Sequence, residues 1–208
     1  MDKIVYGLLG FTSVIGVAVI LWRMWALRWG GVVPTSTVAA MHACRTPEDV
    51  LGLRARCQER PSALGRLLII AADHLDWSKA ENESIVETAA RREVVRLERG
   101  IVVLEVIVGI APLLGLVGTI LGMMNVFGDL GKTGLTNMND AAKLAEGISL
   151  ILRATLIGLL ISIPSLVAWS YFTKKVEILA VELETLCTEF IRRQYCEVNE
   201  DKKAGKNA

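Results

Sequence analysis

Apolar residues in this chain of 208 collect in three long blocks, which charged and polar sequence separates. The first block, residues 4–21, holds no charged residue. The second, residues 100–128, is interrupted only by Glu105, and the third, residues 147–173, only by Arg153. A helix that rises ~1.5 Å per residue needs about 20 apolar residues to cross the hydrocarbon core of a bilayer. The pattern therefore predicts three transmembrane helices.

Trp22 and Trp25 extend the first block, because tryptophan side chains favour the membrane interface. A cleaved signal peptide is the competing interpretation of this block. Only Lys3 provides a positive charge before the apolar run, and the run is longer than a usual signal-peptide core. No clear small-x-small cleavage site precedes Arg23. We therefore expect an uncleaved transmembrane helix.

Lysine and arginine near the block ends predict the orientation in the membrane. Arg23 and Arg28 follow the first block, four arginines between residues 91 and 99 precede the second, and two lysines follow the third. Since cytoplasmic flanks are enriched in these residues, we expect a periplasmic N-terminus and a cytoplasmic C-terminus. The opposite ends carry only Lys3, Lys132 and Lys143.

These patterns predict an all-α, polytopic membrane protein with three transmembrane helices and long cytoplasmic helical extensions. The expected segments are a first transmembrane helix with a short periplasmic N-terminus (1–29), a cytoplasmic helical region (30–99), a second transmembrane helix (100–128), a periplasmic loop (129–146), a third transmembrane helix (147–173), and a cytoplasmic C-terminal helix and tail (174–208).

The cytoplasmic region carries helix start and stop signals. Thr46 followed by Pro47 is typical of a helix start, and that helix should end near Pro61. A second helix should begin at Ser62. Its apolar residues 67–70 are too few to span a membrane, so we expect them to pack against other helices.

Two longer helices are expected to join the cytoplasmic region to the membrane. Neither glycine nor proline occurs in residues 78–99, so one long helix should continue straight into the second span. Its charged face, residues 91–99, is typical of a solvated, ion-paired surface. Another helix should leave the third span after Phe172 and fray in the charged tail from Glu197.

Composition supports the membrane class and argues against several others. Hydrophobic residues make up 52% of the chain, and its mean hydropathy is +0.45. The net charge of +1, without a basic patch interleaved with aromatic residues, gives no indication of nucleic-acid binding. No phosphate loop, nucleophile elbow or HExxH motif occurs, so we predict neither an enzyme nor a bound cofactor.

Cysteine and histidine residues offer one weak alternative. The four cysteines contain no CxxC pair, and all should lie in the cytoplasm, where disulfides are rare. His42, Cys44 and Cys57 could together hold zinc, whereas ordinary buried thiols explain the cysteines more simply. We expect no metal site.

Small residues form one face of the second transmembrane helix. Steps of four, three and four residues separate Ala111, Gly115, Gly118 and Gly122, so all four share a side of the helix. Such faces allow helix backbones to approach closely in lipid, where van der Waals packing stabilises helix association. We also assign Pro112, Gly158 and Pro164 to helix packing.

Hydroxyl side chains within the spans allow two interpretations. Thr155 and Ser162 lie seven residues apart on one stripe of the third span. In an antiparallel hairpin, Thr119 of the second span can lie at a depth similar to that of Thr155. The hydroxyls then line a narrow ion path or a collar around another helix. Alternatively they only join the helices, and Thr119 bonds back to its own backbone.

Two charged residues within the spans are functional candidates by default. Glu105 lies near the cytoplasmic boundary, where it can receive an ion or pair with a basic group such as Arg99. Arg153 lies in the outer half of its span. It can extend outward to a lipid phosphate, Glu146 or Asp129, or contact a partner or gate the path.

Residues 111–127, APLLGLVGTILGMMNVF, and residues 147–172, GISLILRATLIGLLISIPSLVAWSYF, together resemble the paired signature of the MotA/TolQ/ExbB proton-channel family. The similarity is closest to the ExbB and TolQ branch. It lies in the AP…GL.GT..G…F run and in the later GI……AT..GL..(A/S)IP run. A stator nearer to MotA is disfavoured by the short inner loop and the missing extra span.

The resemblance implies an inner-membrane, homo-oligomeric ring, a pentamer, around single-span partners of the ExbD or TolR kind. Proton flow would move the partner against the ring and transmit work to the outer membrane through a TonB- or TolA-like protein. It also implies that Thr119 and Thr155 line the pore near an essential aspartate of the partner. Membrane lipids are also expected to contact the protein.

One departure from the family pattern leaves a rival function open. The family places glutamate where this chain has Leu150, and Arg153 stands two positions before Thr155. The partner's carboxylate would then be the sole titrating group on the path. The rival is a non-conducting scaffold that assembles and stabilises a single-span partner. The sequence also does not decide whether the transported ion is a proton or sodium.

Overall fold

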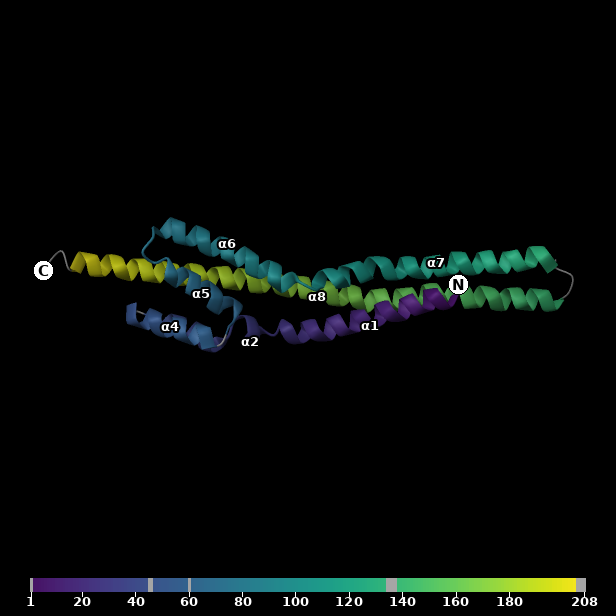
Figure 1. Ribbon diagram of the computed structural model, residues 1–208, viewed down its shortest axis with the longest axis horizontal. Coiled ribbons are helices and arrows are strands. Elements are labelled where there is room, and N and C mark those ends of the chain that lie inside the picture. The colour runs from purple at the N-terminus through teal and green to yellow at the C-terminus, as the bar shows by residue number, and fades with distance from the viewer. Residues whose placement is uncertain (1, 45–46, 60, 134–137, 205–208) are drawn as a thin grey trace. The chain divides into compact units, whose positions relative to one another are not determined.

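The computed structural model describes residues 2–44, 47–59, 61–133 and 138–204, and every regular element in these ranges is an α-helix (Figure 1). The elements are α1 (Asp2–Ala26), α2 (Trp29–Val32), α3 (Thr35–Ala43), α4 (Pro47–Glu59), α5 (Ala63–Asp73), α6 (Lys79–Glu98), α7 (Ile101–Thr133) and α8 (Met138–Ala204).

Three described helical stretches are long and apolar enough to cross a membrane: Ile4–Ala26, Ile101–Gly128 and Ala145–Cys196. They confirm the predicted fold class, an all-α protein with three transmembrane helices. The chain forms two compact units. The first holds residues 1–23 and 100–172, and the second holds residues 24–99 and 173–208.

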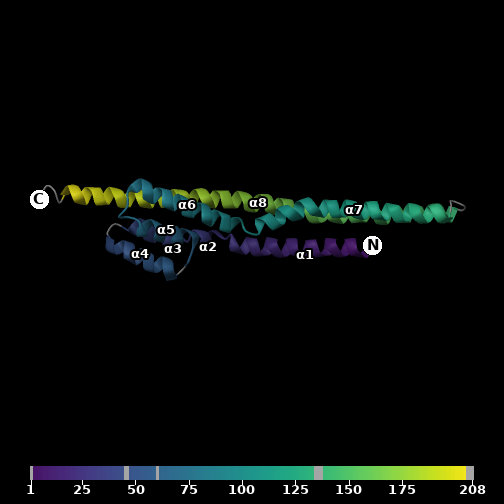
Figure 2. The same cartoon turned by 45° about the horizontal axis from the view of Figure 1, so that its top comes forward.

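In the first unit, α7 lies alongside the first part of α8, as both views show (Figures 1 and 2). The two backbones come so close that a side chain would collide at the contact. A Cβ atom on Gly115 would lie 2.9 Å from the Cα of Thr155, and one on Gly158 would lie 2.6 Å from the carbonyl oxygen of Ala111. Only glycine leaves room for this approach.

The same face of α7 continues toward its far end. A Cβ atom on Gly122 would lie 2.5 Å from a side-chain carbon of Ile151. One on Gly118 would lie 3.0 Å from the Cβ of Ala154 and 3.1 Å from a methyl carbon of Val5 on α1. The small residues of α7 are thus the positions at which α8 and α1 approach it.

Two expectations about helix bounds are wrong. The segment 129–146 is not all loop, because α7 continues to Thr133 and α8 begins at Met138. The tail is helical to Ala204, beyond the expected fraying at Glu197. Glycine and polar residues in these stretches suggested irregular structure, yet helices already nucleated by long apolar segments continue at low cost.

The expected continuous helix into the second span is also wrong, since α6 ends at Glu98 and α7 begins at Ile101. Gly100 has a φ of 84°, a left-handed conformation that only glycine adopts readily. A glycine directly after a helix is a common helix-ending signal, and Gly100 acts as one here although it also begins the second apolar block.

The second unit is built around α5, which contacts α2, α4 and α6. Ser62 caps α5, its hydroxyl accepting a hydrogen bond of 3.0 Å from the N–H of Gly65. Leu67 and Leu68 are buried, in agreement with the expected packing role of this apolar run. The helix start expected at Pro47 is observed, whereas its proposed cap, Thr46, lies outside the described residues.

Two buried polar residues of the second unit, Asn82 and Glu93, have specific hydrogen-bond partners. Asn82 of α6 donates hydrogen bonds to the carbonyl oxygens of Ala71 (3.0 Å) and His74 (3.1 Å) at the end of α5. Glu93, expected on a solvated face, is instead buried, and its carboxylate accepts hydrogen bonds from Arg66 and Arg96. Pairing with two arginines stabilises the charge of this buried carboxylate.

We expect Gly158→Ala to destabilise the first unit by about 1–3 kcal/mol, because the new Cβ atom would force α8 away from the backbone of Ala111. Gly109→Ala is the matched control, since no atom lies within 4 Å of its Cβ position. Both free energies of unfolding can be measured by titrating a denaturing detergent into micelles of the purified protein. Equal stability of the two variants would contradict the close contact.

Candidate functional site: the contact between α7 and α8

Pro112 lies inside α7 and leaves one backbone carbonyl without its usual helical partner. Proline has no N–H, so the carbonyl oxygen of Val108, four residues earlier, loses its hydrogen bond. Ser162 of α8 replaces the missing donor, its hydroxyl lying 3.0 Å from that oxygen. Because an unpaired carbonyl is costly in a membrane, this bond ties α8 to a defined point on α7.

Thr155 forms a second polar link between the same helices. Its hydroxyl donates a hydrogen bond of 3.3 Å to the carbonyl oxygen of Gly115. The glycine makes this possible, since the Cα of Thr155 occupies the space where a side chain of residue 115 would begin. Thr155 is half-buried, so its hydroxyl is held by α7 while part of the side chain remains accessible.

Thr119 is not joined to Thr155. Its hydroxyl donates a hydrogen bond of 2.7 Å to the carbonyl oxygen of Leu116, within its own helix. Thr155 lies opposite Gly115, about one helical turn (~6 Å) from Thr119 along α7. The two threonines therefore have neighbouring depths and are not directly opposed.

These hydroxyls have a common chemical property. Thr119, Thr155 and Ser162 each commit their single proton to a backbone carbonyl. Each oxygen then presents only lone pairs to any further group. Such oxygens can coordinate a cation or accept a hydrogen bond from water or hydronium, but they cannot themselves supply a titrating group near neutral pH.

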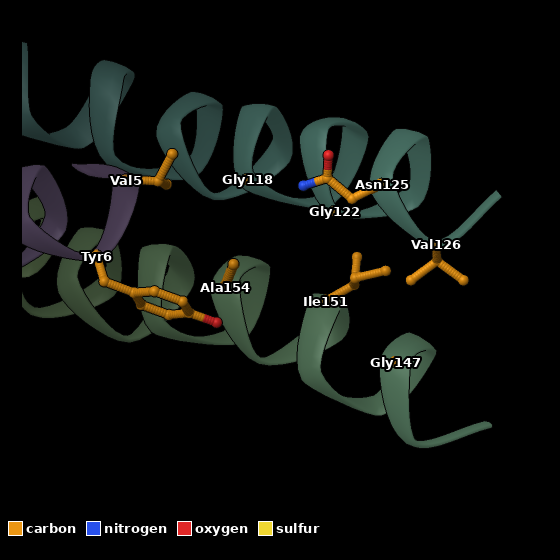
Figure 3. A pocket seen from close by; sticks show the side chains of 9 residues that line it. All are labelled: Val5, Tyr6, Gly118, Gly122, Asn125, Val126, Gly147, Ile151 and Ala154. Atoms are coloured by element: carbon orange, nitrogen blue, oxygen red, sulfur yellow. The ribbon is translucent and has the colours of Figure 1, made fainter. Parts of the chain in front are cut away.

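A cavity of about 190 Å³ lies where α1, α7 and α8 meet (Figure 3). Gly118 and Gly122 form its α7 wall, and Ala154 and Ile151 form its α8 wall. Its remaining lining residues are Val5, Tyr6, Asn125, Val126 and Gly147. Neither Thr119 nor Thr155 is among them, so this cavity and the two threonines are separate features.

The two charged candidates are both exposed in the isolated chain. Glu105 lies in the second turn of α7. It forms no ion pair with any described residue of the first unit. Arg153 is likewise without an ion pair among the described residues, including Glu146. The side chains of Asp129 and Leu150 lie outside the described residues.

Cys44 and Cys57 of the possible zinc site are buried, and His42 is exposed. Burial raises the pKa of the Cys57 thiol, which disfavours the thiolate form that binds metals. His42 instead lies 3.8 Å from the carboxylate of Glu189. Among the described residues, no group of three or more His, Cys, Asp or Glu side chains is arranged to hold a metal ion.

The helix contact of Ser162 with Val108 was not found by sequence reasoning, although a signal was present. Pro112 identifies Val108 as a carbonyl in need of a donor, and hydroxyl residues on the neighbouring span are the available donors. The sequence could not select between Thr155, Ser162 and Ser165, because that choice depends on how α8 is aligned against α7. Ser165 bonds to Ile161 of its own helix instead.

The segment that contains this contact matches a known family. The sequence pattern of the MotA/TolQ/ExbB proton channel family matches residues 63–185. This range includes α5, α6 and α7 and most of α8, and it contains both threonines and both charged candidates.

Individual relatives point to the same group. The chain is 37% identical to the biopolymer transport protein ExbB of Helicobacter pylori over 92 residues, which cover 44% of this chain and 61% of that protein. It is 27% identical to putative ExbB-like protein 3 of Synechocystis over 203 residues, 94% of this chain and 93% of that protein. It is 35% identical to TolQ of the Tol-Pal system in Pseudomonas aeruginosa over 107 residues, 50% and 44% of the two chains. The chain thus spans less than two thirds of the H. pylori and P. aeruginosa proteins.

We expect Ser162→Ala to destabilise the protein by about 1–2 kcal/mol, since it leaves the carbonyl of Val108 without a donor. In a Pro112→Ala background the loss should nearly vanish, because position 112 regains an N–H for the same carbonyl. Detergent unfolding of the four proteins in this double-mutant cycle measures the difference.

Ser165→Ala is the control on α8, since that hydroxyl bonds only within its own helix. An unchanged effect of Ser162→Ala in the Pro112→Ala background would show that Ser162 does not compensate for the proline.

Proposed function

Because the chain belongs to the MotA/TolQ/ExbB proton channel family, we propose that it is the ring subunit of an inner-membrane motor that couples the proton motive force to work at the outer membrane. The ring is a homopentamer around a single-span partner of the ExbD or TolR kind. Ions pass between ring and partner, and a TonB- or TolA-like protein carries the resulting work outward. The similarity to both ExbB and TolQ proteins supports this assignment.

The hydroxyl of Thr155 is the observation that carries the conducting role. It lies in a transmembrane segment, half-buried, with its proton committed to the carbonyl of Gly115. Its remaining lone pairs suit a hydrated ion that passes along α8. The hydroxyl of Thr119 lies about one helical turn further along α7, and it likewise presents its lone pairs to an ion. Together they act as stepping points for the ion, without covalent chemistry.

The acid that takes up and releases the proton comes from the partner in this proposal. Leu150 stands where the family pattern has glutamate, and Arg153 carries no carboxylate. Neither threonine titrates. Glu105, in the second turn of α7, receives the ion at the cytoplasmic end. A partner carboxylate near Thr155 would therefore be the titrating group along the remainder of the path.

The positions of the basic residues support a periplasmic N-terminus and a cytoplasmic C-terminus. Lysine and arginine are concentrated at the ends of the spans that lead toward residues 30–99 and 174–208. With this orientation the second unit is cytoplasmic. Glu105 lies at the cytoplasmic end of its span, and Arg153 lies toward the periplasmic end, where it contacts lipid or partner.

A non-conducting scaffold is the second candidate, and one observation favours it. All three hydroxyls of the candidate site bond to backbone carbonyls, and two of those bonds cross from α8 to α7, as packing between helices requires. In that function the ring would assemble and stabilise a single-span partner while the hydroxyls only hold the spans together.

Proton uptake into liposomes that contain the chain and its ExbD- or TolR-like partner distinguishes the two functions. We expect Thr155→Val to reduce uptake at least tenfold under a pH gradient, because valine keeps the shape of threonine and removes only the hydroxyl. Loss of the bond to Gly115 should lower the free energy of unfolding by about 1 kcal/mol or less, so assembly should persist.

Thr155→Ser is the matched control, since it keeps the hydroxyl and should retain most of the uptake. Full uptake by an assembled Thr155→Val complex would exclude the hydroxyl as a stepping point. Absence of uptake from the assembled wild-type complex would favour the scaffold.

A further inference from the structure

Arg23, near the end of α1, is a buried charge without a partner. The residue is only 3% exposed, and two nitrogens of its guanidinium, Nε and Nη2, are buried without a hydrogen bond. No hydrogen bond or ion pair joins Arg23 to any described residue. An ionised group is costly to bury unless it is paired and hydrogen-bonded. The isolated chain thus leaves a strong donor unsatisfied.

The immediate neighbours of Arg23 do not neutralise it. The guanidinium carbon lies 5.1 Å from the centre of the Trp22 ring. A Cβ atom on Gly100 would lie 3.2 Å from Nε, so the backbone of Gly100 passes close to the guanidinium. A cation–π contact attracts the positive charge but supplies no acceptor for the N–H groups. Among the described residues of the first unit, none supplies an acceptor for these N–H groups.

The position of Arg23 indicates where that acceptor comes from. The first span is Ile4–Ala26, so Arg23 lies at one end of it, at the boundary of the hydrocarbon. The adjacent Trp22 and the nearby Trp25 are 55% and 73% exposed, as expected of tryptophans at a membrane interface. The phosphates of lipid headgroups lie at this depth. A guanidinium binds phosphate with two parallel hydrogen bonds.

A groove between α1 and α8 begins one turn from Arg23. It has a volume of about 390 Å³, and its lining is mainly apolar. On α1 the lining runs from Ile20 back through Val17, Ser13, Gly10 and Leu9 to Tyr6. Ile20 precedes Arg23 by three residues, which is one helical turn. From Ile20 to Tyr6 the groove extends ~21 Å along α1, which is more than the ~15 Å depth of one leaflet of hydrocarbon.

We propose that Arg23 and this groove form a binding site for one phospholipid with a net negative headgroup. The phosphate binds the guanidinium of Arg23, and one acyl chain fills the groove between α1 and α8. Charge complementarity selects the headgroup, because no carboxylate among the described residues offsets the charge of Arg23. An amine-bearing zwitterionic headgroup would bring a second positive charge to a site that has no acceptor for it. Because Nε and Nη2 are buried in the isolated chain, this binding requires the side chain of Arg23 to move toward the headgroup.

Binding of phosphatidylglycerol and phosphatidylcholine to the full chain in neutral detergent tests the site, with bound lipid counted by native mass spectrometry. We expect the wild type to prefer phosphatidylglycerol at least tenfold. Arg23→Gln should lose this preference, whereas Arg28→Gln, which removes an exposed arginine nearby in the sequence, should keep it. Arg23→Gln should melt no lower than wild type in lipid-free detergent, because it removes an unpaired buried charge.

The groove is tested separately. The Cβ position of Gly10 is open, and Gly10 lines the groove, so Gly10→Leu should fill it and weaken phosphatidylglycerol binding at least tenfold. Gly7 is equally open and does not line the groove, so Gly7→Leu is the control. Glycerol phosphate, which carries the phosphate without acyl chains, should bind at least tenfold more weakly than the lipid.

Three results would overturn the proposal. The first is a preference for phosphatidylglycerol that survives Arg23→Gln. The second is glycerol phosphate binding as tightly as the lipid, which would mean a site for free phosphate. The third is a change of oligomeric state in Arg23→Gln with unchanged lipid binding, which would mean that a second copy of the chain supplies the acceptor. None of these readouts depends on ion conduction.

Discussion

The approach of α7 to α8 at Gly115 and Gly158 is the constraint on which the candidate site depends. In lipid, apolar helices gain little from contacting each other rather than acyl chains, so close packing must stabilise their association. The two glycines remove the atoms that would keep the backbones apart. Only at this separation can the hydroxyl of Thr155 on one helix reach a carbonyl on the other. A wider spacing would leave the hydroxyls and carbonyls of the two spans to find partners separately.

Polar groups in the spans follow from the same requirement that backbone carbonyls be satisfied where water is absent. Pro112 removes one donor from α7, and Ser162 of α8 supplies another to the same carbonyl. The proline therefore does more than bend a helix, because it creates a polar point to which the neighbouring span is attached. Thr155, two turns further along the contact, is held by the rigid backbone around it. A hydroxyl positioned in this way suits an ion path better than one on a mobile side chain, since its lone pairs are already oriented.

Buried charge is treated differently in the two units. Glu93 in the second unit is buried with Arg66 and Arg96 against its carboxylate, so the chain itself supplies the pairing. Arg23 in the first unit is equally buried and has no such partner among the described residues. The difference matches their surroundings, because a residue at the end of a span meets lipid headgroups and a residue within a helical bundle does not. An arginine at the end of a span can therefore lack a partner within the protein, because lipid phosphates can supply one.

Sequence alone determined the class of the protein, its three spans, and the small residues of α7, because length, apolarity and side-chain size are properties of each segment by itself. The family resemblance came from residues 111–127 and 147–172. Tertiary structure decided which residues meet: Thr155 faces Gly115 rather than Thr119, Ser162 reaches Val108, and α6 and α7 separate at Gly100. These features depend on the alignment of segments that are far apart in the chain. A shift of one turn between two helices leaves every sequence pattern unchanged and replaces every contact between them.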